Sequence, residues 1–86
     1  MLGDSREQED AAERRRVRRS LLHLAFPASL IRWRPDVAAR QLDRLLDGPE
    51  PHPSRWNPWR ELQRLAWWTW RCLTLLQAQR ARLTAA

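Results

Sequence analysis

Apolar residues recur at helical spacing in three stretches of this chain, and the sequence contains no alternating pattern of the kind that indicates a strand. The spacing predicts α-helices over residues 6–26, 35–47 and 58–83, with a short bridging piece after the first and a Pro-rich connection over residues 48–57. The expected fold class is all-α, as a small helical hairpin or three-helix arrangement with a long C-terminal amphipathic helix. The second and third helices are expected to form the hairpin, and the first completes the bundle or projects as an arm.

The first predicted helix carries a narrow apolar stripe. Ser5 followed three residues later by Gln8 matches a capping box, which favours a helix that starts near this point. Pro27 interrupts the pattern because proline cannot continue a helix interior. The stripe repeats every three or four residues and consists of Val17, Leu21, Leu24 and Ala28.

The second predicted helix has clear start and stop signals. Pro35 suits a first helical position, and Gly48 followed by Pro49 is a typical end. Its acidic and basic residues are expected to form ion pairs within the helix, among Asp43, Asp47, Arg40 and Arg44.

The third predicted helix is the longest and the most aromatic. Asn57 is a good N-cap, and Pro58 suits the first helical position. At 100° per residue, its apolar residues form one face that includes Leu62, Leu65, Ala66, Thr69, Cys72, Leu73, Leu76 and Leu83. A row of basic residues lies almost opposite this face and consists of Arg60, Arg64, Arg71 and Arg82.

Length and charge set the next limits. A chain of 86 residues is one small domain or less, and domains of this size often depend on a partner for stability. Residues 1–13 hold five acids and one Arg, whereas residues 14–86 hold fifteen Arg and five acids. We expect an acidic N-terminal arm over residues 1–13 and a single basic helical domain over residues 14–86. A net charge of +6 favours acidic partners.

Several classes of function find no support in the sequence. His23, His52 and Cys72 are too scattered to form a zinc site of known spacing, so no metal or other cofactor is expected. Cys72 falls on the apolar face of its helix, where a cysteine behaves as a small buried hydrophobe. No catalytic constellation or small-molecule site is evident, so a non-enzymatic protein is expected. With no signal peptide or transmembrane stretch, a cytoplasmic or other reducing compartment is the expectation.

The Trp residues of the third helix are the main candidates for function. Adjacent helical residues point about 100° apart, so Trp67 and Trp68 cannot both face one core. Trp59 and Trp70 lie at the edge of the apolar face, where they extend the core or join an interface. Because Trp and Arg dominate binding hot spots, we expect a docking surface for a larger protein or complex. Its residues are Trp67, Trp68, Leu75, Trp70 and Trp59. The remaining tryptophans, Trp33 and Trp56, are expected to pack over helix ends.

Two other interpretations remain open. A nucleic-acid-binding module would use the Arg-rich helices, although the complete absence of Lys is also what a GC-rich coding sequence produces. A peripheral membrane helix on an anionic surface is the third interpretation, and it has less support. The residues expected to contact a polyanion are Arg14, Arg15, Arg16, Arg18, Arg19, Arg60, Arg64 and Arg71.

Overall fold

The computed structural model describes residues 2–52 and 55–85, and the described part of the chain folds into four α-helices. The predicted all-α fold is confirmed. The third predicted helix corresponds to α4, and the second to α3, whose bounds match the prediction. The short piece after Pro27 forms a helix of its own. The helices are α1 (Leu2–Ala25), α2 (Ala28–Trp33), α3 (Pro35–Asp47) and α4 (Pro58–Ala85).

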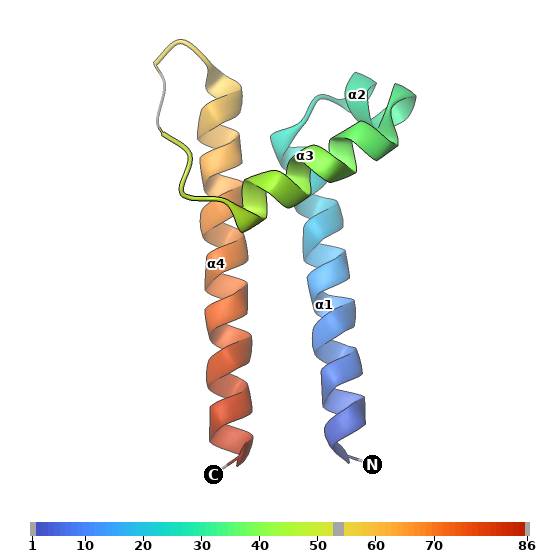
Figure 1. Cartoon of the computed structure of the whole chain (residues 1–86), viewed down its shortest axis with the longest axis vertical. Helices are drawn as coiled ribbons and strands as arrows, with labels where there is room; N and C mark the ends of the chain where they lie inside the picture. The colour runs from blue at the N-terminus through green and yellow to red at the C-terminus, as the bar shows by residue number, and fades with distance from the viewer. Residues whose placement is uncertain (1, 53–54, 86) are drawn as a thin grey trace.

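The long helices α1 and α4 run antiparallel along most of their lengths, and α3 lies obliquely across them (Figure 1). The expected hairpin of the second and third helices is therefore not the main pairing. Helix length explains the difference, because α3 has 13 residues while α1 has 24 and α4 has 28. At 1.5 Å per residue α3 spans only about 20 Å, so α1 is the only neighbour long enough to cover most of α4.

The hydrophobic core lies where α3 crosses the two long helices, which we call the crossing region. The C-terminal end of α1 contributes Leu21 and Ala25, α3 adds leucines one turn apart, and α4 adds a small residue. The predicted stripe is wrong at Ala28, which is exposed and belongs to α2. Ala25 and Ala66 are completely buried. The core consists of Leu21, Ala25, Phe26, Leu42, Leu46 and Ala66.

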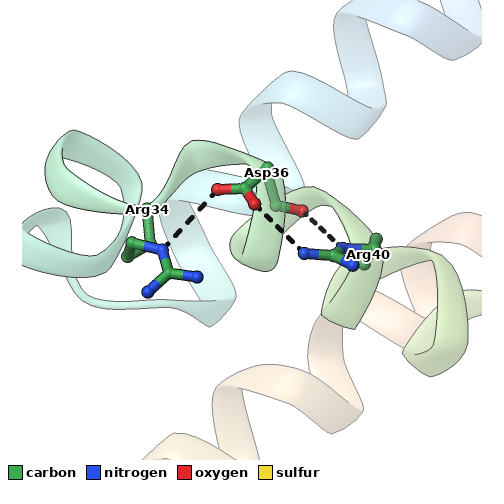
Figure 2. Close-up of polar contacts among 3 residues, drawn as sticks. All are labelled: Arg34, Asp36 and Arg40. Atoms are coloured by element: carbon green, nitrogen blue, oxygen red, sulfur yellow. Dashed lines mark hydrogen bonds and ion pairs between the residues drawn. The ribbon is translucent and has the colours of Figure 1, made fainter.

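Polar side chains make local contacts at the first turns of α4 and α3. Asn57 Oδ1 accepts a hydrogen bond from the backbone N–H of Trp59 at 3.1 Å, which confirms the predicted N-cap of α4. At the start of α3, Asp36 accepts a hydrogen bond from Arg40 at 3.0 Å and lies 3.8 Å from Arg34 (Figure 2). Partial desolvation raises the pKa of Asp36. Hydrogen bonds from the Val37 and Asp36 backbone amides, together with the positive charges of Arg34 and Arg40, outweigh this effect and hold the pKa below its usual value.

The predicted ion pairs within α3 are wrong in their partners. Arg40 pairs with Asp36 instead of Asp43, and Asp43 forms an ion pair with Arg18 of α1. Spacing along one helix could not reveal the second pair, because Arg18 and Asp43 meet only when α3 crosses α1.

Farther from the core, α1 and α4 are joined by polar side chains. Gln77 is buried and donates hydrogen bonds to the Asp10 carbonyl oxygen at 3.1 Å and to Glu13 Oε1 at 3.0 Å. Arg80 also donates to Glu13, at 2.9 Å. Hydrogen bonds from Gln77 and then Arg80 hold the pKa of Glu13 below its usual value. α1 begins at Leu2, ahead of the predicted start at Arg6, and the division into an acidic arm and a basic domain stays a prediction.

Candidate functional site

The apolar surface of α4 is divided between two directions. Ala66 and Gln77 are buried against α1 and the crossing region, and Trp70 packs against the core. Periodicity places Leu65 and Leu76 on the same packing face, but they are 54% and 55% exposed. The single packing face inferred from periodicity is therefore wrong. α1 and α3 cover only one side of α4, and its apolar residues extend around the helix beyond that side.

The uncovered side carries a row of apolar residues, which we call the outer stripe. At 100° per residue its members lie within an arc of about 100°, so they share one face of α4. Cys72 lies among them and is exposed, which corrects the expectation that it would be a buried core residue. The large side chains of the stripe are between 47% and 72% exposed. The outer stripe consists of Leu65, Trp68, Cys72, Leu75, Leu76 and Leu83.

Trp67 and Trp68 both bind the connection that follows α3. Trp67 Nε1 donates to the Gly48 carbonyl oxygen at 2.9 Å, and Trp68 Nε1 donates to Glu50 Oε1 at 2.8 Å. Their rings meet edge to face, with centroids 5.1 Å apart. We call these contacts, together with the ion pair between Arg64 and Glu50, the loop anchor. The two Trp residues that no single core could hold therefore have a structural role within the chain.

Glu50 is the residue at the centre of the loop anchor. Its Oε1 accepts hydrogen bonds from both Arg64 Nε, at 2.8 Å, and Trp68. The hydrogen bond from Arg64, followed by that from Trp68, holds the pKa of Glu50 below its usual value, and Glu50 raises the pKa of Arg64. Sequence reasoning missed Glu50 because it lies in the Pro-rich segment, 14 residues from Arg64, outside any helical period.

The remaining tryptophans differ in their surroundings. Trp70 packs against the core, and the Arg18 guanidinium lies 5.5 Å from its ring centroid. Trp59 is 38% exposed and is not among the residues that pack against the core. The expectation that Trp33 and Trp56 pack over helix ends is wrong, since they are 73% and 93% exposed. Trp33 instead has the guanidinium of Arg32 5.5 Å from its ring centroid.

The arginines proposed for polyanion contact separate into engaged and available groups. Arg18 pairs with Asp43, Arg64 pairs with Glu50, and Arg71 stacks on Trp67 at 4.9 Å. The predicted row on α4 is thus interrupted by internal contacts, and its exposed members are Arg60, Arg71 and Arg82. Within residues 5–52 and 55–84, no carboxylate lies within ion-pair distance of the remaining arginines on α1, which are all exposed. They are Arg14, Arg15, Arg16 and Arg19.

The described residues contain neither a metal-binding cluster nor a membrane-spanning helix. Among them, no cluster of three or more His, Cys, Asp or Glu side chains is placed to hold a metal ion. No helix in the described ranges has the length and apolar character needed to cross a bilayer. No protein-family model, curated protein or solved structure matches this chain.

Proposed function

We propose that this protein is a non-enzymatic interaction subunit whose outer stripe binds an amphipathic helix of a larger protein. The observation that carries the proposal is the exposure of four leucines along one side of α4, at 54% to 72%. Monomeric proteins rarely expose contiguous apolar surface of this kind, and such surface is typical of binding sites. The leucines are Leu65, Leu75, Leu76 and Leu83.

Periodicity supports a helix as the bound element. Leu65, Trp68, Cys72 and Leu75 follow intervals of three, four and three residues, the a/d spacing that packs one helix against another. An open depression of about 510 Å³ continues this row toward the C-terminal end of α4. It lies between Leu75 and Leu83, with Arg82 at its margin.

Charge favours a partner with acidic residues along one edge. At 100° per residue, Arg71 and Arg82 lie within 20° of each other, beside Leu75 at the border of the outer stripe. Acids on the partner helix would meet both. A second copy of this chain fits less well, because a symmetric pairing brings the same basic edge to the interface twice and joins two molecules of charge +6.

The docking residues therefore shift from those inferred from the sequence. The indole N–H groups of Trp67 and Trp68 are engaged in the loop anchor, so the leucines contribute most of the free apolar surface. Trp68 contributes through its ring, which is 47% exposed. Trp67 supports the surface indirectly, because its indole N–H binds the Gly48 carbonyl oxygen.

The test is site-specific photocrosslinking in cells. A benzophenone amino acid replaces Leu76 in the outer stripe, and a matched protein carries it at Gln41 on the exposed side of α3. We expect the label at position 76 to crosslink one protein segment that has helical periodicity and acids along one edge. The label at position 41 should not capture that segment. A synthetic peptide of the segment should then bind the purified protein.

Substitutions at exposed positions complete the test. We expect Leu76→Ser combined with Leu83→Ser to weaken binding of the peptide more than tenfold, while the helical circular dichroism signal stays the same. Arg82→Glu should weaken binding at low salt and have less effect at high salt. Crosslinks only to a second copy, binding of anionic vesicles but no peptide, or unchanged affinity in the double variant would each disprove the proposal.

A further inference from the structure

A second surface, separate from the outer stripe, lies in the groove between α1 and α4. A cavity of about 380 Å³ opens there, with walls formed by one face of α1 and a tryptophan ring from α4. The α1 residues recur at intervals of three, one and three positions, which places them side by side on that face. We call this cavity the arginine groove, and it is lined by Ala11, Arg14, Arg15, Arg18 and Trp70.

The arginines of the groove differ in how they are held. Arg18 is fixed by its ion pair with Asp43 of α3 and by stacking over Trp70. Arg14 and Arg15 are exposed, and no carboxylate of the described side chains lies within ion-pair distance of either. The groove therefore combines the positioned guanidinium of Arg18 and the ring of Trp70 with two further guanidiniums. These two make no ion pair with the described side chains.

The combination fits a ligand with both a negative charge and a flat ring. Guanidiniums bind phosphate oxygens in pairs of parallel hydrogen bonds, and indole and guanidinium planes stack on bases. The cavity is large enough for one nucleotide. We propose that the arginine groove binds single-stranded nucleic acid, with phosphates at Arg14 and Arg15 and a base beside Arg18 and Trp70.

Charge limits the arginine groove where it adjoins Glu7 and Asp10 of α1. An adjoining cavity of about 390 Å³ shares Arg14 but is lined by Glu7 and Asp10 as well. Their carboxylates repel phosphates, so the strand would enter the groove from the side of Arg15. The surface is distinct from the outer stripe, which lies on the uncovered side of α4, so the two binding activities can be tested separately.

Two double variants with equal charge change provide the test. Arg14→Gln with Arg15→Gln removes two charges from the groove, and Arg16→Gln with Arg19→Gln removes two exposed charges that do not line it. Fluorescein-labelled 12-nucleotide oligouridylate and oligothymidylate are the probes, measured by fluorescence anisotropy from 50 to 200 mM salt. The two probes distinguish RNA from DNA.

We expect the groove variant to bind at least tenfold more weakly at 50 mM salt and the control variant to change less than threefold. The slope of log affinity against log salt should fall in magnitude by about 1.4 in the groove variant, or about 0.7 for each lost phosphate contact. Trp70→Leu should weaken binding with little change in this slope, because stacking releases no counterions. If Trp70→Leu lowers the helical content, the two arginine variants decide the result alone.

Three results would overturn the inference. One is the absence of binding to either oligonucleotide at 50 mM salt. Another is an equal loss in both double variants, which would indicate general attraction to the basic surface. The third concerns unlabelled competitors of the labelled oligonucleotide. If heparin or a 12-base-pair duplex displaces it as well as the single strand does at the same concentration, the groove does not select an unpaired base.

Discussion

In the crossing region, α1, α3 and α4 meet through buried apolar side chains, whereas farther along α1 and α4 meet through polar ones. We call the latter part the distal pair, residues 5–14 of α1 and 74–84 of α4. Leu46 in the crossing region is 2% exposed, while Leu83 in the distal pair is 72% exposed. Gln77 takes the buried position in the distal pair that an apolar residue would hold in a core.

The difference shows how a small chain can divide folding from binding. Burial in the crossing region provides the main favourable term for folding, because apolar surface is removed from water there. In the distal pair, solvated ion pairs such as Arg80–Glu13 contribute little to stability. The leucines of that region face outward, so a partner that covers them would supply the apolar burial the distal pair lacks.

The largest expected effect comes from truncating the core. Leu46→Ala should lower the free energy of unfolding by about 2–5 kcal/mol, since it removes buried methyl groups and leaves a cavity. Leu76→Ala, the matched change in the outer stripe, should alter the same quantity by less than about 0.5 kcal/mol because the side chain is already exposed. Urea unfolding followed by circular dichroism measures both. Equal effects would contradict the contrast between the two regions.

A smaller effect is expected from the polar contact within the distal pair. Gln77→Ala removes the donor to both the Asp10 carbonyl oxygen and Glu13, and it should cost about 1–3 kcal/mol. In this variant, the amide hydrogen exchange rate should increase in residues 5–14 and should change less near Leu42. Gln79→Ala at an exposed site on the same helix is the control. Uniform acceleration over the whole chain would mean that the two regions unfold together.

The smallest expected effect is a pH response in the loop anchor. The folded state lowers the pKa of Glu50, so folding favours the carboxylate form. The contribution of this carboxylate to the free energy of unfolding is therefore complete above the ordinary glutamate pKa. The contribution is lost as pH falls through the lowered value. Between pH 6 and 3, the indole N–H resonance of Trp68 should shift more than that of Trp67, whose acceptor is a carbonyl oxygen. Glu50→Gln should remove this difference, and equal shifts in the wild-type protein would contradict the assigned contacts.

The sequence alone determined α3, α4 and most of α1, because the signals of these helices are local. Pro35 and Gly48 predicted the bounds of α3, and Asn57 with Pro58 predicted the start of α4. Capping and helical periodicity depend on residues only a few positions apart, so they can be detected in a single sequence. The same periodicity identified an apolar face on α4 that is broader than its covered side.

Only the tertiary structure decided which part of that face is buried and what Trp67 and Trp68 contact. Gln77 reaches Asp10 across 67 residues, and Trp68 reaches Glu50 across 18. No helical period relates such positions, since their distance depends on how α1, α3 and the connection are placed around α4. The outer stripe is what those neighbours leave uncovered, and this is why its residues could be listed from the sequence but not separated from the core.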